Sequence, residues 1–263
     1  MRKYLYIFKS ELMSNIHYIF NNVTAFIGCF MLLFVLLNLW KYMYSDPNDL
    51  INGYNMNQTI WYIIITEIIW GILGGRKLCN KISTDVKSGN IAYNINKPYN
   101  YVGYALFNHL GYIFVKGIVY IILGLLTGLL FLKSFPNINI LEFIYVLITI
   151  IMAISINILL VIIIGLFSFF IEDSNPFYWV YSKFILIVGT LFPIEFFPKM
   201  IQPILTYSPI YVIAYGPAKL FVDFNYFAFV KVFFAQIIYF IIIYLLCLLI
   251  YKKGVRKLNV NGG

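Results

Sequence analysis

Long apolar stretches separated by short polar segments dominate the 263-residue chain. A helix needs roughly 20 apolar residues to cross a bilayer, and six stretches approach or exceed this length. The pattern predicts an all-α, polytopic membrane protein with six transmembrane helices, at Val23–Trp40, Thr59–Gly75, Tyr104–Leu132, Leu141–Ile171, Trp179–Phe196 and Phe229–Tyr251. Because no linker or internal repeat divides the chain, we expect a single transmembrane domain over residues 1–263.

The residues before the first span carry an amphipathic stripe. Apolar side chains recur there at steps of three and four, at Leu5, Phe8, Leu12, Ile16 and Ile19. This spacing places them on one face of a helix. We expect an N-terminal amphipathic helix in the inner membrane interface. The alternative is a helix that packs on the rest of the protein.

The segment Phe192–Asp223, between the fifth and sixth spans, is apolar but rich in proline. Prolines stand at positions 193, 198, 203, 209 and 217. Proline lacks the backbone N–H and fixes φ, so this density prevents one continuous helix. We expect short helices that dip into the outer leaflet, covered by protein or reaching water.

Composition supports the membrane interpretation. Apolar residues make up 62% of the chain and charged residues 11%, against about 45–50% and about 25% in soluble domains. These values exclude a soluble enzyme, a disordered tail and a disulfide-rich secreted module. The abundance of Ile, Asn, Lys and Tyr is typical of an AT-rich bacterial genome, so we expect a bacterial cytoplasmic membrane.

The positive charge follows membrane topology. With the N-terminus inside, twelve of the 19 lysines and arginines fall in inner segments and five in outer ones. Cytoplasmic segments of membrane proteins carry this excess. We therefore expect both termini in the cytoplasm, membrane lipids as the surroundings and no nucleic-acid partner, despite the net charge of +9.

Motifs for chemistry are missing from the sequence. The segment Gly71–Lys77 imitates a phosphate-binding loop but lacks its glycine spacing and its following Ser or Thr. The two histidines and three cysteines are scattered, without metal-ligand spacing. We expect no catalytic residue, no metal and no cofactor bound by this chain, which is therefore not expected to be an enzyme.

Two ionisable residues lie inside predicted spans. Glu67 falls in the second span and Lys116 in the third. Charges within a bilayer are costly and usually pair or face a cavity. A structural Glu67–Lys116 pair between the two helices is the simpler hypothesis. The alternative places Glu67 beside a substrate path.

The inner loop Arg76–Asn100 is the longest polar segment. Its apolar residues Ile82, Val86, Ile91 and Ile95 have an amphipathic spacing interrupted by Gly89. Glycine commonly ends a helix, so we expect two short helices joined at Ser88–Asn90. The loop either lies at the interface through its positive charge or docks a cytoplasmic partner.

Two segments together resemble the ABC-2 family of transporter permeases. The inner loop has an acidic residue, then Ser-Gly-x-Ile, and closes with Lys97-Pro98, as in the loop between the second and third spans of that family. The outer segment resembles its proline-rich stretch, with Phe192-Pro-Ile-Glu-Phe-Phe-Pro, Tyr207-Ser-Pro and Tyr215-Gly-Pro-Ala. The closest resemblance is to a small six-span bacterial subfamily. In place of the family's acidic-basic cluster before the glycine, this chain has only Asp85 and Lys87.

The resemblance implies the transmembrane subunit of an ATP-driven exporter. A separate cytoplasmic ATPase subunit would bind ATP and Mg²⁺ and hydrolyse the ATP. The permease would pair with a second copy of itself or with a similar permease. The coupling loop that contacts the ATPase would comprise Asp85, Val86, Lys87, Ser88, Gly89, Asn90 and Ile91.

Three alternatives remain at the level of sequence. An ion-coupled secondary transporter would use Glu67 and Lys116 at the midplane. An intramembrane enzyme would need a catalytic cluster that the sequence lacks. A structural subunit without a transport role would have the same composition. The cargo of an exporter could be a lipid, a drug-like molecule or a peptide.

Overall fold

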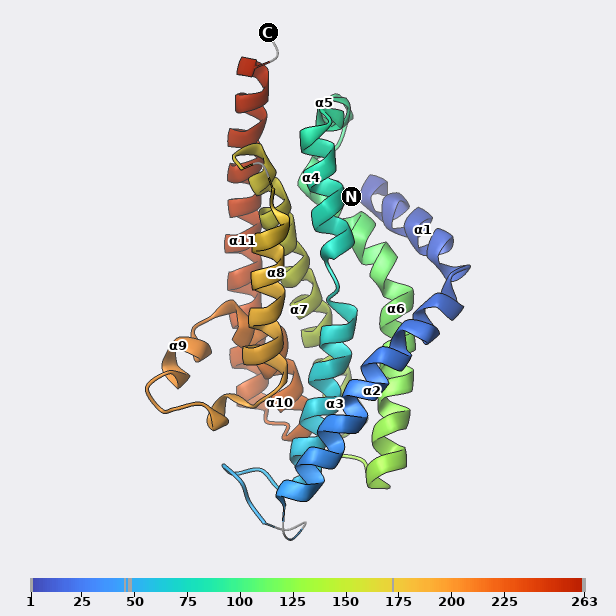
Figure 1. Cartoon of the computed structure of the whole chain (residues 1–263), viewed down its shortest axis with the longest axis vertical. Coiled ribbons are helices and arrows are strands. Elements are labelled where there is room, and N and C mark those ends of the chain that lie inside the picture. Colours follow the sequence, from blue (N-terminus) through green and yellow to red (C-terminus); the bar gives the residue numbers. More distant parts are fainter. Residues whose placement is uncertain (1, 45, 47–48, 172, 262–263) are drawn as a thin grey trace.

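The computed structural model describes residues 2–44, 46, 49–171 and 173–261. Regular structure within these residues is helical, and the one backbone bridge, between Ile51 and Tyr54, belongs to a turn. Most of the long helices run roughly along the long axis, α2 crosses them obliquely, and α1 lies on one side beside α6 (Figure 1). The all-α prediction is confirmed.

Five helical segments among the described residues are long and apolar enough to cross a membrane. They cover five of the six predicted spans. Their helices are α2 (Ile19–Met43), α3 (Met56–Ile72) continued by α4 (Arg76–Lys87), α6 (Tyr101–Leu132), α7 (Ile140–Leu166) and α11 (Tyr226–Asn261).

The expected fifth span, Trp179–Phe196, is not one long helix. It begins inside α8 (Asn175–Phe184), continues as a π-helix over Ile185–Thr190 and ends in a 3-10 turn over Ile194–Phe196. Pro193 precedes that turn, and its missing N–H cannot continue a helical hydrogen-bond ladder. The described residues thus hold five membrane-length helices rather than the expected six.

Helix α3 is the centre of the bundle. Its side chains are buried from Thr59 to Ile69 without interruption, whereas most side chains of α2 are exposed and most of those described in α11 are exposed or partly exposed. Two glycines of α6 allow close approach to α3: a Cβ on Gly124 would stand 2.4 Å from Ile68, and one on Gly128 would stand 2.3 Å from Trp61. Small residues have this role where membrane helices pack tightly.

Helix α1 (Arg2–Ile16) packs along α6. The Tyr4 and Phe107 rings stack at 5.4 Å, and a Cβ on Gly111 would meet the Phe8 carbonyl at 2.5 Å. Leu5, on the same predicted stripe as Phe8, remains 59% exposed. The N-terminal helix therefore has the protein contact of the second hypothesis, and it keeps apolar surface on its outer side.

The proline-rich segment forms short pieces, as its prolines predict. They are α9 (Gln202–Thr206), a π-helix over Tyr211–Tyr215 and α10 (Gly216–Val222). Helix α9 projects from the bundle, while α10 lies among the long helices (Figure 1). Buried Gln236 of α11 donates hydrogen bonds of 2.9 Å to the carbonyls of Thr149 and Val212, which joins α11, α7 and this segment.

Candidate functional site

The polar loop consists of two helices with a sharp turn between them. Helix α4 ends at Lys87 and α5 (Asn90–Ile95) begins at Asn90, so the break lies where the sequence predicts it. Gly89 in the break has φ +74°, a left-handed conformation that glycine adopts without steric cost. We call the end of the molecule that carries α5 the loop end, and the opposite one the far end.

Apolar anchors hold the two helices against the bundle. Val86 and Ile91 are buried, with 5% and 0% of their surface exposed. One turn before Val86, Ile82 lies so close to α7 that a Cβ on Gly165 would stand 2.9 Å from it. The loop helices are therefore packed parts of the fold and not a flexible connection.

Asp85 faces the bundle. Its carboxylate accepts a hydrogen bond of 2.9 Å from the Tyr101 hydroxyl in the first turn of α6. The Tyr101 ring stacks on Tyr251 of α11, with 5.6 Å between centroids and 12° between planes. Helix α4 is thereby connected to α6 and α11 through one side chain.

The tip of the loop faces outward and is formed by Lys87, Ser88, Gly89 and Asn90, all of which are exposed. The Lys87 ammonium lies 3.9 Å from the Asp173 carboxylate, and both side chains are about half exposed. Of the seven predicted coupling residues, these four form a surface that a partner can reach. Asp85, Val86 and Ile91 position that surface.

Glu67 and Lys116 do not form the predicted ion pair. The two ion pairs among the described residues are Lys87–Asp173 and Lys219–Asp223. The Lys116 ammonium lies beside Gly74 and 5.0 Å from the centre of the Tyr120 ring. Gly74 follows Glu67 by seven residues, which corresponds to a rise of about 10 Å along a helix. The Lys116 ammonium, beside Gly74, therefore does not lie at the level of Glu67.

Glu67 is completely buried in α3. Neither of its carboxylate oxygens has a hydrogen-bond partner among the described residues. The neighbouring Thr66 hydroxyl donates a hydrogen bond of 2.9 Å to the Thr190 carbonyl, where the π-helix ends. The Thr190 side chain interacts with the Glu67 carboxylate but does not come within hydrogen-bond distance, which is unusual because buried polar groups are nearly always bonded.

A second acid, Glu195, is partly buried toward the far end and is not evident from the sequence. The Glu195 carboxylate accepts hydrogen bonds through Oε1 from the hydroxyls of Tyr54 and Tyr215, while its Oε2 has no partner among the described residues. The Lys219 ammonium lies 4.2 Å from the centre of the Tyr54 ring. The sequence signal is weak, because the tyrosines come from segments far apart in the chain.

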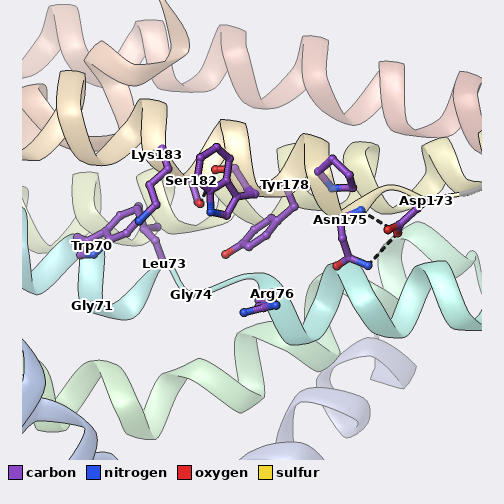
Figure 2. A pocket seen from close by; sticks show the side chains of 12 residues that line it. Trp70, Gly71, Leu73, Gly74, Arg76, Asp173, Asn175, Tyr178, Ser182 and Lys183 are labelled. Atoms are coloured by element: carbon purple, nitrogen blue, oxygen red, sulfur yellow. Dashed lines mark hydrogen bonds between the residues drawn. The ribbon is translucent and has the colours of Figure 1, made fainter.

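A cavity of about 620 Å³ opens between α8 and the junction of α3 with α4. Figure 2 shows Trp70 and Lys183 at one end of it, Tyr178 and Arg76 in the middle, and Asp173 at the other end. The Tyr178 hydroxyl accepts a hydrogen bond of 3.0 Å from the Gly75 amide. This contact joins α8 to the non-helical link between α3 and α4.

The described residues contain no cluster of three or more His, Cys, Asp or Glu side chains that could hold a metal ion. The features that the described residues offer are an exposed loop tip, a buried acid at Glu67, a partly buried acid at Glu195 and a charged cavity.

Comparison with curated proteins finds no match. A protein-family model does match, and it is described as "ABC-2 family transporter protein". The match extends over residues 13–262, nearly the whole chain and all of the sites above. Together with the membrane-length helices, it shows that this protein belongs to the ABC-2 family of membrane transporters.

Proposed function

We propose that the chain is the permease subunit of an ATP-driven exporter in a bacterial cytoplasmic membrane. The observation that carries the proposal is the loop tip at Lys87–Asn90, which is exposed while its flanking helices are anchored in the bundle. A docking element needs both properties, because a mobile loop would absorb a push without transmitting it. ATP and Mg²⁺ would bind to separate ATPase subunits.

The contacts of α4 supply a route for movement. A force on the tip reaches α7 through Ile82 and Gly165, and reaches α6 and α11 through Asp85, Tyr101 and Tyr251. Packed helices move as rigid elements, so a displacement at the tip changes how they lie against each other. Two such permeases, identical or similar, would form the complete transmembrane unit.

Six crossings fit the contacts better than five. The segment that starts in α8 contacts the bundle at three levels: Tyr178 at Gly75 in the link after α3, Thr190 at Thr66 of α3, and Phe196 beside Trp40 near the end of α2, with ring centres 5.3 Å apart. We infer that it crosses the membrane in short pieces. An even count places both termini on the cytoplasmic side, in agreement with the start of α1, α5 and the end of α11 lying toward one end (Figure 1).

The test is purification of the tagged full-length chain from its native membrane, followed by an ATPase assay of the eluate. We expect a soluble ATPase subunit to co-purify. The double variant Lys87→Glu with Asn90→Asp makes the tip acidic, removes the Lys87–Asp173 ion pair and should release most of the ATPase. Lys199→Glu is the matched control, since Lys199 is exposed in the outer segment. Absence of any ATPase under gentle extraction contradicts the proposal, as does equal loss in the control.

The unpartnered Glu67 favours a second candidate, an ion-coupled secondary transporter. A protonatable group buried at the middle of a membrane helix is a typical part of such transporters. The chain alone is reconstituted in vesicles with an imposed pH gradient, and internal pH is followed with a dye. Proton movement that requires no ATPase and disappears in Glu67→Gln supports this candidate. Vesicles whose internal pH does not change support the exporter.

A further inference from the structure

The cavity beside α8 lies where the chain passes from α3 to α4. Helix α3 ends at Ile72 and α4 begins at Arg76. Gly75 is held in the link: a Cβ there would stand 2.7 Å from Val161, and its amide bonds Tyr178. Helix α3 has 17 residues, about 25 Å of helix, so its end lies near one boundary of a bilayer about 30 Å thick.

The cavity carries two cations that lack ion-pair partners among the described residues. Arg76 and Lys183 both line it and are exposed. In Figure 2 the Lys183 side chain extends toward Trp70, while Arg76 lies across from α8. A planar guanidinium and an ammonium facing one hollow are typical of phosphate and carboxylate recognition.

The acid at the other end of the cavity is already engaged. The Asp173 carboxylate accepts hydrogen bonds from the Asn175 backbone amide at 3.1 Å and from its side-chain amide at 2.9 Å. These bonds lower the pKa of the Asp173 carboxyl, and the Lys87 ammonium adds to the effect. Asp173 forms its ion pair with Lys87 and none with Arg76 or Lys183, so these two cations remain available to a ligand in the cavity.

Apolar surface continues from the cavity along α8. Trp179, Val180 and Phe184 are 62%, 60% and 53% exposed. A tail lying on this face would enter the bilayer directly, because α8 forms the outer wall of the cavity. Charge at one end and apolar surface at the other match the two halves of an amphiphile.

We propose that the cavity binds the anionic headgroup of an amphiphile, with Arg76 and Lys183 on the headgroup and the tail along α8. The binding site itself does not depend on the proposed function. Only the statement that the bound amphiphile is the exported cargo rests on that function. The competing explanation is that the two cations merely extend toward the general lipid surface, as interfacial lysines and arginines do. A specific site and general attraction make different predictions.

The test uses the full-length chain with Trp179→Phe, reconstituted in phosphatidylcholine vesicles. Trp40 and Trp61 are buried, so Trp70 becomes the tryptophan open to the cavity. Brominated lipids quench tryptophan on contact. We expect brominated phosphatidylglycerol to quench Trp70 at a roughly tenfold lower mole fraction than brominated phosphatidylcholine. Each cation should strengthen binding of the anionic headgroup about fivefold, and screening by salt reduces the combined effect of the two cations.

Arg76→Gln with Lys183→Gln should abolish this preference and leave quenching by brominated phosphatidylcholine unchanged, which also shows that the fold is intact. Lys252→Gln with Lys253→Gln removes the same charge from the exposed loop-end part of α11 and should keep the preference. Equal loss in both variants, or no preference at all, overturns the site.

Inorganic phosphate, compared with chloride at equal ionic strength, separates the two sources of the anion. Failure of phosphate to displace the brominated lipid supports an amphiphile, whereas displacement at millimolar phosphate shows a free-anion site and overturns the proposal. No ATPase is present in these samples. Failure of the lipid-quenching test therefore says nothing about the ATPase co-purification test. Failure of the co-purification test likewise says nothing about lipid binding in the cavity.

Discussion

The Tyr101 hydroxyl donates a 2.9 Å hydrogen bond to the Asp85 carboxylate, and this bond connects the loop helix α4 to the start of α6. Tyr101 is also stacked on Tyr251 of α11. Removing the hydroxyl alone separates these contacts, because phenylalanine keeps the ring. Substitution of Tyr101 therefore tests whether the hydrogen bond to Asp85 transmits movement from the loop to the bundle.

We predict that Tyr101→Phe leaves the complex assembled but uncouples it. Loss of a bond to a charged acceptor costs about 1.5–3 kcal/mol where the acceptor is buried, and we expect about 1 kcal/mol at this partly buried site. The unfolding temperature should fall by a few degrees. The stimulation of the co-purified ATPase by the permease should fall severalfold. Tyr112→Phe on the same helix is the control, and an equal effect there contradicts the prediction.

Gly89→Ala tests the turn at the loop tip. A Cβ at Gly89 meets nothing within 4 Å, so the cost arises from φ +74° alone and is about 1 kcal/mol. We expect nearly normal stability and a reduced yield of co-purified ATPase. Gly53→Ala carries the same backbone strain at φ +87°, also in open space, outside the loop. It should lower stability equally and leave the ATPase yield intact.

Gly128→Ala tests the contact between α6 and α3. Its Cβ would overlap Trp61, whose indole N–H donates to the Ser134 carbonyl at 3.2 Å and so holds the ring in place. Overpacking of this kind costs about 1–3 kcal/mol. We expect a clear drop in the unfolding temperature in detergent. Gly28→Ala, where a Cβ meets nothing within 4 Å, should leave that temperature unchanged or slightly higher.

Glu67→Gln and Lys116→Gln test the absence of an ion pair. Because the two side chains are out of register, their effects on unfolding free energy should add within about 0.5 kcal/mol in the double variant. Glu67→Gln alone should change stability little, since the amide has nearly the same size and the carboxylate oxygens that it replaces have no hydrogen-bond partner among the described residues. A coupling energy well above this limit would show that Glu67 and Lys116 interact directly and would contradict the prediction.

Tyr215→Phe tests the Glu195 cluster. It removes one of the two hydrogen bonds to Glu195 Oε1 and keeps the aromatic packing. We expect the proline-rich segment to become more accessible, seen as faster cleavage between residues 198 and 208 by protease added to intact cells. Tyr211→Phe, on the same π-helix, is the control. Equal cleavage rates in the two variants would show that the cluster does not hold the segment.

The sequence predicts the parts of this structure that depend on local pattern. Membrane-length apolar runs locate α2, α3, α6, α7 and α11, and Gly89 locates the break between the loop helices. The interrupted segment after α8 was predicted as one helix because its apolar run continues past Pro193 almost without polar residues. Hydropathy does not report whether a backbone is α-helical or π-helical.

Tertiary register is the part that sequence reasoning missed. The expectation that Glu67 meets Lys116 rested on their positions in two consecutive spans, whereas Lys116 lies beside Gly74. The Glu195 cluster draws Tyr54 and Tyr215 from segments 161 residues apart, which no local pattern records. The cavity is hidden for the same reason, since Arg76 and Lys183 meet only through the packing of α8.

The link at Leu73–Gly75 gives the bundle a pivot. Helix α3 is enclosed on all sides and cannot tilt without breaking the core, but α4 is attached to it only through three non-helical residues. In the proposed mechanism, a push on the loop tip would swing α4 about Gly75 like a short lever. Its fulcrum is at the wall of the cavity, so the stroke of the ATPase would widen or narrow the space around Arg76 as α4 shifts together with the helices packed against it.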